Sequence, residues 1–302
     1  MSSSLSPLGR SVIVARLRAA GCVFAEDEAQ LLISAAQTPA DLAAMVDRRA
    51  AGLPLEHVLG WAEFCGLRIA VGPGVFVPRR RTEFLVRQAA ALTRIADGPA
   101  GHVLARQAAV VVDLCCGSGA VGAALVAALE HVELHAVDID PAAVRCARRN
   151  LATGHVYDGD LYEPLPDSLR GRVGILIAIT PYVPTEAIRL LPPEARVYEP
   201  RVALDGGADG LDVLRRVIAA APWWLAPGGH LLLETSEGQA PQTVDTLARA
   251  GLIPRVARCD DLTATVVIGT RPALTQLRAA CGRAAGVGDG VSPGRHAVTS
   301  SM

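Results

Sequence analysis

The segment from Ala109 to Gly122, AVVVDLCCGSGAVG, constrains this chain more than any other part of its 302 residues. It begins with a run of apolar residues, which is typical of a strand buried on both faces in a parallel sheet. Glycines at 117 and 119 then favour a tight turn, and small apolar residues predict a helix from about Ala120. A strand, a glycine turn and a helix in this order are typical of an α/β fold with a ligand site at the turn.

Acidic residues stand at the ends of two predicted strands. Asp113 ends the first strand, and Asp138 follows a second one over residues 133–137. Because open α/β sheets bind ligands outside the carboxyl ends of their strands, we expect Asp138 to bind ribose hydroxyls and Asp113 to contact an ammonium group of the ligand. The predicted cofactor-binding residues of the loop between them are Cys115, Cys116, Gly117, Ser118 and Gly119. Together these features predict a site for a nucleoside cofactor.

Two classes of cofactor fit this pattern. Residues 117–122, GSGAVG, also satisfy the G-x-G-x-x-G fingerprint of dinucleotide sites, which is a weak signal by itself. The final strand patterns, over 253–259 and 263–270, are too close together for a helical crossover, so this pair must be antiparallel. That ending, the acid before the loop and a later Thr-Pro-Tyr segment favour S-adenosylmethionine. We therefore predict S-adenosylmethionine as the cofactor and keep an NAD-linked oxidoreductase as the alternative.

Composition limits the class of protein further. Hydrophobic residues make up 51% and charged residues 20%, which is typical of a globular chain. A net charge of -1 argues against a surface that coats nucleic acid, so we expect no direct nucleic-acid binding. The seven cysteines are scattered without a C-x-x-C pair, which predicts reduced thiols and no metal site. Since no signal peptide or uninterrupted apolar span is found, we expect a cytoplasmic protein that does not contact membranes.

The N-terminal part of the chain has a helical pattern. Residues 1–60 predict a small helical domain, with three short amphipathic helices expected over 11–20, 26–36 and 39–51. Thr38 precedes the third helix in a capping-box pattern that has Asp41 in place of Glu. Two roles for this domain are equally compatible with the pattern: recognition of a partner, or a lid over the edge of the sheet.

The period of apolar residues changes to two at Trp61. Residues 61–78 therefore predict a β-hairpin linker, with a third short strand over 75–77. Residues 79–271 form the predicted S-adenosylmethionine-binding α/β domain. Residues 272–302 are expected to be a partly disordered tail.

Two further strand ends complete the predicted site. After a short strand over 156–160, Asp160 and Leu161 are expected near the base of the cofactor. A buried strand over 174–179 delivers the predicted catalytic residues Ile179, Thr180, Pro181 and Tyr182 to the edge that holds the glycine loop, with Ile179 also among the cofactor-binding residues. Because Tyr182 stands between two prolines at a strand end, we expect it to contact the ligand. Residues 191–210 are expected to be loop-rich and to flank the site.

The order of these features resembles that of the HemK/PrmC protein-(glutamine-N5) methyltransferases over roughly residues 10–271. The matching residues are Pro54-Leu55 with Leu59-Gly60, Glu63-Phe64 with Gly66, Pro78-Arg79 with Thr82-Glu83, Asp113-Leu114 with Gly117-Ser118-Gly119, Asp138, Pro181-Tyr182 with Pro184, and Glu199-Pro200 with Ala203-Leu204. Many methyltransferases share the glycine loop, whereas the segments at 63–66 and 78–83 are more specific. The resemblance implies a small helical N-terminal domain followed by a seven-stranded, Rossmann-like class I methyltransferase sheet that binds S-adenosylmethionine.

The resemblance also implies an activity and a partner. This family methylates the side-chain amide of the glutamine in the Gly-Gly-Gln loop of bacterial peptide-chain release factors. Its Asn-Pro-Pro-Tyr signature ends the fourth strand, where the Asn side chain and a backbone carbonyl accept the two amide hydrogens and the Tyr ring packs on the substrate. Residues 179–182 match this signature in position. The resemblance therefore implies methyl transfer to a release factor through orientation and electrostatics, without a metal.

The chain departs from the family pattern at two positions. Ile179 stands where the family has the signature Asn, and an Ile side chain accepts no hydrogen bond. The Thr180 carbonyl remains as an acceptor, and losing one preorganised partner of this kind costs about 10²–10³ in rate. Arg81 stands where the family usually has an acidic residue. The alternatives are therefore a catalytically impaired cofactor-binding paralogue, a methyltransferase with a different substrate, and a nucleic-acid adenine methyltransferase.

Overall fold

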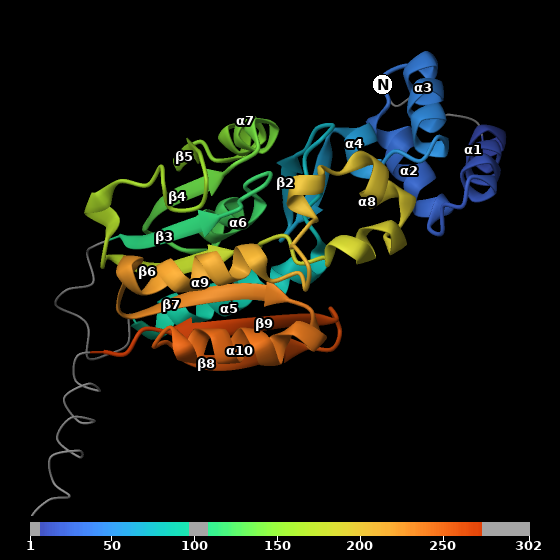
Figure 1. Ribbon diagram of the computed structural model, residues 1–302. Coiled ribbons are helices and arrows are strands. Elements are labelled where there is room, and N and C mark those ends of the chain that lie inside the picture. The colour runs from blue at the N-terminus through green and yellow to red at the C-terminus, as the bar shows by residue number, and fades with distance from the viewer. Residues whose placement is uncertain (1–6, 97–107, 274–302) are drawn as a thin grey trace, which may run out of the picture.

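The computed structural model describes residues 7–96 and 108–273. Within these residues a seven-stranded sheet has the strand order β5-β4-β3-β6-β7-β9-β8 (Figure 1). The strands are β3 (Ala109–Leu114), β4 (Val132–Asp138), β5 (His155–Asp158), β6 (Val173–Ala178), β7 (Leu225–Thr235), β8 (Ile253–Cys259) and β9 (Ala264–Thr270). Neighbouring strands are parallel from β5 to β7, and β9 pairs antiparallel with both β7 and β8. The predicted α/β sheet and its antiparallel final pair are confirmed.

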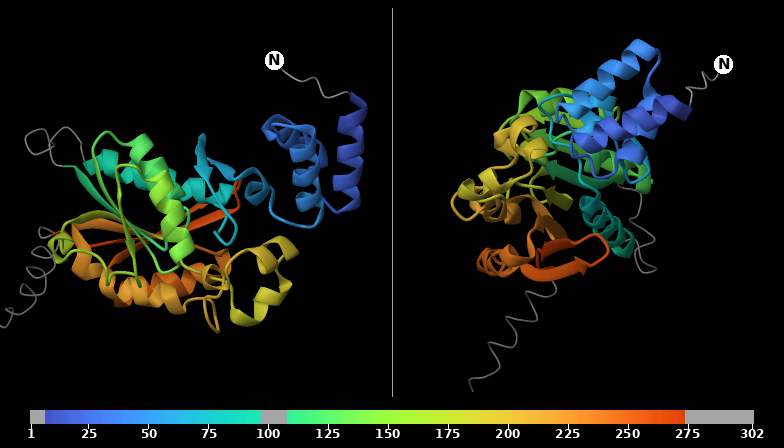
Figure 2. Two further views of the ribbon diagram at one scale, coloured as in Figure 1. Left: turned by 90° about the horizontal axis from the view of Figure 1, so that it is seen from above. Right: turned by 90° about the vertical axis from the view of Figure 1, so that its right-hand side faces the viewer.

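Helices cover both faces of this sheet, which explains why its central strands are apolar throughout. The helices are α5 (Glu83–Ala96), α6 (Ala120–Ala128), α7 (Pro141–Asn150), α9 (Asp212–Trp224) and α10 (Ala240–Arg249). The first three pack on one face, and α9 and α10 pack on the other (Figure 2). Val111 and Val112 point to opposite faces and both are fully buried. Each such side chain contributes about 1.5–3 kcal/mol to folding, so both sides of β3 stabilise the base of the glycine loop.

The N-terminal helices form a cluster with its own core. They are α1 (Pro7–Ala19), α2 (Ala25–Ala35), α3 (Pro39–Ala50) and α4 (Leu55–Leu59), so the three predicted helices are present and α4 is additional. Leu17, Leu32 and Val46 are buried between them. Thr38 Oγ1 accepts a hydrogen bond from the Asp41 N–H at 3.1 Å, as predicted for the cap. The Asp41 carboxylate, however, accepts from the Gln37 N–H rather than from that of Thr38, so only half of the capping box forms.

A β-hairpin follows the helices. β1 (Trp61–Phe64) and β2 (Leu67–Ala70) pair antiparallel around a turn at Cys65 and Gly66, as predicted. The expected third strand over 75–77 is wrong. Side chains take the hydrogen bonds that a neighbouring strand would use, because His57 Nε2 lies 2.8 Å from the Val75 carbonyl oxygen and Glu199 accepts from the Val77 N–H. Residue 75 is a bend, and residues 76–77 belong to no helix or strand.

The segment between β6 and α9, which includes the residues 191–210 predicted to be loop-rich, contains short helices. These are η3 (Thr185–Leu190), α8 (Pro193–Tyr198) and η4 (Arg201–Ala203). Three more short 3-10 helices lie elsewhere in the chain, namely η1 (Arg80–Thr82), η2 (Asp167–Leu169) and η5 (Glu237–Gln239). α8 lies against the N-terminal helices (Figure 1). Arg49 Nη1 is 2.6 Å from Glu194 Oε1, and the Tyr198 hydroxyl donates to the Ala51 carbonyl. This segment therefore connects the helical cluster to the carboxyl end of the sheet.

The predicted tail over 272–302 lies outside the described residues except for its first two positions. None of the helices in the described part of the chain is long and apolar enough to cross a membrane.

Candidate cofactor and acceptor site

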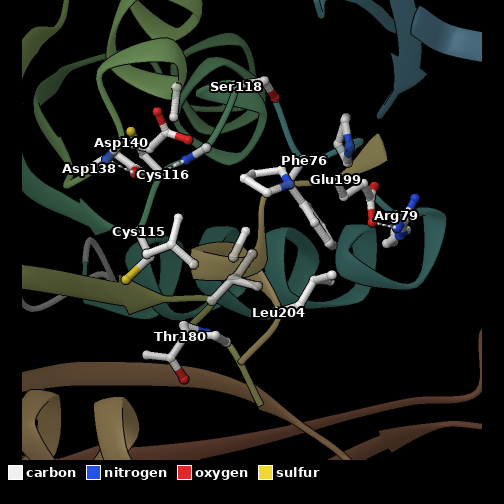
Figure 3. Close-up of a pocket in the computed structure, with 18 of the residues that line it drawn as sticks. Phe76, Arg79, Cys115, Cys116, Ser118, Asp138, Asp140, Thr180, Glu199 and Leu204 are labelled. Atoms are coloured by element: carbon white, nitrogen blue, oxygen red, sulfur yellow. Dashed lines mark hydrogen bonds and ion pairs between the residues drawn. The ribbon is translucent and has the colours of Figure 1, made fainter. Parts of the chain in front are cut away.

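A cavity of about 740 Å³ lies at the carboxyl ends of β3, β4 and β6. The predicted site residues in its wall are Cys115, Cys116, Gly117, Ser118, Asp138, Asp160, Leu161, Ile179, Thr180, Pro181 and Tyr182. Figure 3 shows the glycine loop and Asp138 on one side, and Phe76, Arg79, Glu199 and Leu204 on the opposite side. The carboxyl ends of the strands thus form one wall of the cavity, and the end of the hairpin linker and the segment after β6 form the opposite wall.

The glycine loop has a backbone that suits close approach of a ligand. Gly117 has a φ of +55°, and Gly119, which precedes the first turn of α6, has a φ of +77°. A Cβ atom at residue 119 would lie 3.0 Å from Leu151 Cδ1 and 3.3 Å from the backbone of Ala147. Gly119 is therefore needed for packing of α6 on α7, and it does not itself line the cavity.

Asp138 holds the loop and also faces the cavity. Its carboxylate accepts hydrogen bonds from the N–H groups of Gly117 at 2.8 Å and Asp140 at 2.9 Å. Burial raises the pKa of this carboxyl above its ordinary value, and the two backbone donors oppose that shift. A carboxylate has about four lone-pair directions, so acceptor capacity remains for ligand hydroxyls. This geometry suits the predicted contact with ribose.

Asp113 lies beneath the loop rather than in the cavity wall. It is only 1% exposed, and it accepts a hydrogen bond from the Gly122 N–H at 3.2 Å. The alternation along β3 turns this side chain toward α6, and Asp113 is not among the residues that line the cavity. Burial raises its pKa to about 7. The structure thus places Asp113 against the first turn of α6, and its predicted contact with the ligand stays a prediction.

The remaining loop residues, Cys115, Cys116 and Ser118, line the cavity with uncharged side chains. Cys115 and Cys116 line it, and burial raises the pKa of both thiols, so they stay protonated at neutral pH. Ser118 is 3% exposed, and its carbonyl accepts a hydrogen bond from Asn150, whose side chain also bonds the backbone of Ala70 in the hairpin. Asn150 therefore joins the hairpin to the glycine loop, a link that periodicity did not predict.

The residues after β5 form the next part of the wall. Asp160 lines the cavity, and its Oδ2 atom lies 2.6 Å from Arg216 Nη2 on α9. Leu161 is 8% exposed and has a φ of +52°, which turns its side chain toward the same cavity. The part of the wall predicted to hold the base of the cofactor therefore consists of the apolar Leu161 side chain and the carboxylate of Asp160, which is paired with Arg216.

The four predicted catalytic residues follow β6 along the wall. Ile179 packs partly against the core on the α5 side, and its apolar side chain lines the cavity. Thr180 is 1% exposed, and within the described residues its Oγ1 atom has no hydrogen-bond partner. The Tyr182 carbonyl accepts from Gln239 Nε2 at 3.0 Å, which fixes the backbone after the strand.

Charged residues opposite the glycine loop were not predicted as site residues. Arg79 pairs with the buried Glu199, and Arg81 pairs with Glu234 at the end of β7. Arg81 also donates to the Tyr182 hydroxyl. The sequence contains a signal for this wall, since Arg79 and Arg81 belong to the run PRRRTE, but their acidic partners are more than 100 positions away.

Comparisons with known proteins show what this chain is similar to. The family described as Methyltransferase small domain matches residues 100–170. A release factor glutamine methyltransferase of Geobacter sulfurreducens is 40% identical over 233 residues, which cover 75% of this chain and 75% of that protein. One of Mycolicibacterium smegmatis is 36% identical over 244 residues, covering 78% of this chain and 82% of that protein. A solved structure of the T. thermophilus 16S rRNA N2 G1207 methyltransferase is 18% identical with a TM-score of 0.47, covering 70% of this chain and 49% of that one.

The two sequence relatives match most of their own length and most of this chain. The predicted methyltransferase class is therefore confirmed over the oxidoreductase alternative, and S-adenosylmethionine is confirmed over NAD as the cofactor. On these similarities the chain belongs to the release factor glutamine methyltransferase family.

Proposed function

We propose that this protein transfers a methyl group from S-adenosylmethionine to the side-chain amide nitrogen of the glutamine in the Gly-Gly-Gln loop of a peptide-chain release factor. The observation that carries the proposal is one cavity wall that contains Gly117, Asp138 and Tyr182. The names of the relatives support the same substrate. The six cysteines of the described residues are free thiols, which supports a cytoplasmic setting.

The residues of the glycine loop fit the cofactor. The Asp138 carboxylate has acceptor capacity for hydroxyl groups, and the Asp138 and Asp140 side chains make this wall favourable for a positively charged ligand, whereas Asp160 is already paired with Arg216. The protonated thiols of Cys115 and Cys116 add no charge. When bound, S-adenosylmethionine supplies a methyl group carried by a cationic sulfur.

The residues after β6 orient the acceptor. An amide nitrogen is a poor nucleophile because its lone pair is delocalised, so the enzyme must fix its position. The Thr180 carbonyl is available to accept one amide hydrogen, and the Tyr182 ring offers a surface for the side chain. Ile179 offers no acceptor for the second hydrogen. We therefore expect turnover about 10²–10³ slower than with a side-chain acceptor at this position.

Transfer of labelled methyl from S-adenosylmethionine to a purified release factor tests the proposal. A release factor with the loop glutamine changed to alanine is the control, and the label must disappear with it. Wild-type protein that binds S-adenosylhomocysteine in a calorimeter but labels no release factor would reject the proposed activity.

The same calorimetry tests the cofactor wall. Asp138→Ala removes the carboxylate expected on the ribose, so the Kd for S-adenosylhomocysteine should rise at least tenfold. Asp158→Ala is the matched control, because Asp158 is exposed at the end of β5 and does not line the cavity. Equal affinities of the two variants would contradict the assignment of Asp138.

Ile179 favours a second candidate, a cofactor-binding protein without turnover. It differs from the first in one result, namely cofactor binding without methyl transfer to any release factor.

A further inference from the structure

Tyr182 is held by a residue outside the predicted catalytic segment. Its hydroxyl oxygen accepts a hydrogen bond from Arg81 Nη2, and the Arg81 guanidinium carbon lies 5.6 Å from the centroid of the Tyr182 ring. Both side chains line the cavity. The phenol ring therefore has a fixed orientation beside the site proposed for the acceptor.

Arg81 is itself anchored in the fold. Its Nε atom donates to Glu234 Oε1 at 3.1 Å, and the other Glu234 oxygen accepts from the Thr82 hydroxyl at 2.6 Å. Glu234 is 3% exposed at the carboxyl end of β7. A buried carboxylate needs its cation, because an unpaired buried charge is strongly unfavourable, so Arg81 has little freedom to leave Tyr182.

This contact decides what the Tyr182 hydroxyl can offer. A phenol has one hydrogen and two lone pairs, and Arg81 donates to the oxygen. Within the described residues that hydroxyl has no hydrogen-bond acceptor of its own, so its hydrogen is available to a ligand. Burial raises the Tyr182 pKa, although Arg81 opposes that shift, and the phenol is therefore protonated at neutral pH.

We propose that the Tyr182 hydroxyl donates to the carbonyl oxygen of the acceptor carboxamide and that Arg81 is the positioning residue for this contact. The inference rests on the proposed function and extends it, because the acceptor is then recognised through its oxygen. With Ile179 in place of an acceptor, the amide nitrogen of the carboxamide has one hydrogen-bond partner, the Thr180 carbonyl. A donor to the carboxamide oxygen therefore supplies a second hydrogen bond that orients the group. A neutral donor also withdraws less electron density from the nitrogen than a guanidinium in direct contact.

Two variants separate the contact from its support. Tyr182→Phe keeps the ring and removes the hydroxyl, and Arg81→Gln removes the cation that holds it. We expect each to raise the KM for the release factor about tenfold and to leave the Kd for S-adenosylhomocysteine within twofold. Arg87→Gln is the matched control, since Arg87 is an exposed arginine of α5 that stacks on Phe84 and does not line the cavity.

A spectroscopic readout tests the positioning role independently of turnover. Ultraviolet titration of tyrosinate, with Tyr182→Phe as the reference, should show a higher Tyr182 pKa in Arg81→Gln than in wild type, because the cation that favours the phenolate is gone. Arg81→Lys, which keeps a cation near Glu234, should be folded and should restore part of the affinity. If Arg81→Gln does not fold, Arg81→Lys carries the comparison.

The outcomes distinguish this inference from the proposed function. If wild type labels no release factor but binds a Gly-Gly-Gln peptide in the presence of S-adenosylhomocysteine, and Tyr182→Phe weakens that binding, the activity fails and the contact stands. A Tyr182→Phe variant with wild-type KM and peptide affinity overturns the contact. Unchanged titration and affinity in the Arg81 variants overturn the positioning role.

Discussion

The side chain at position 179 is expected to set the rate of methyl transfer in the proposed function. In the proposed function Ile179 stands at the position where the family signature has an acceptor for the substrate amide, and its side chain is packed partly against the core. Ile179→Asn supplies that acceptor, so kcat for a release factor should rise about 10²-fold. Methyl transfer under saturating S-adenosylmethionine measures it, and Ile179→Val, which stays apolar, should match wild type. An Asn variant that is folded and no faster than the Val variant would show that the second acceptor is not what limits the rate.

The buried carboxyl of Asp113 should make the stability of the folded protein depend on pH. Burial raises its pKa from 3.8 to about 7, so the folded state binds this proton more tightly than the unfolded state. Its contribution to stability is full below pH 3.8 and is lost as the pH rises through about 7. Asp113→Asn has no such proton and still accepts from the Gly122 N–H. The stability of the variant relative to wild type should therefore increase between pH 4 and pH 8.

Thermal unfolding of both proteins across that pH range measures the effect. A difference in Tm that is the same at every pH would mean that Asp113 is already ionised in the folded protein.

At the scale of elements, the turn between β3 and α6 depends on glycine 119. Gly119→Ala must adopt a φ of +77° and place its Cβ 3.0 Å from Leu151 Cδ1. The left-handed conformation alone costs about 1–2 kcal/mol, so urea unfolding should show a loss of at least that size. Gly238→Ala is the control, because it has no positive φ and no atom within 4 Å of the new Cβ. Equal stabilities of the two variants would mean that α6 and α7 can separate without loss.

The sequence predicts the elements whose signals are local and misses those that depend on distant partners. The run of valines before Gly117 identifies β3 because both of its faces are buried, and the short link between β8 and β9 requires an antiparallel pair. The expected strand over 75–77 fails because Glu199, far along the chain, takes a backbone hydrogen bond there. The α8 helix is missed because it has only six residues, beginning at the second of two adjacent prolines, and so short a segment gives no apolar period to recognise.

The site divides in the same way. The residues of the glycine loop follow from spacing, because one strand and one turn place them. The side-chain direction of Asp113 and the pairing of Arg81 with Glu234 depend on strand alternation and on a contact across the sheet. Neither could be obtained from a motif.

At the scale of the whole molecule, Arg49 joins the helical cluster to the α/β part. It contacts Glu28 in a buried pair and Glu194 on α8. Arg49→Gln leaves Glu28 buried without a cation, so the free energy of unfolding should fall by about 3–5 kcal/mol. Glu194→Gln removes only the more exposed partner and should cost less than 1 kcal/mol. Urea unfolding measures both, and equal losses would show that the contact between the two parts matters more than the buried pair.

The division of the chain at residue 60 stays a prediction, but α8 shows that the two sides of that boundary share a wall. Glu194 and Tyr198 are fastened to α3 and the turn after it, while Glu194 and Ala195 face the cavity. The position of α3 is therefore linked through α8 to residues that line the cavity, because the helix that contacts Arg49 and Ala51 also contributes Glu194 and Ala195 to the cavity wall.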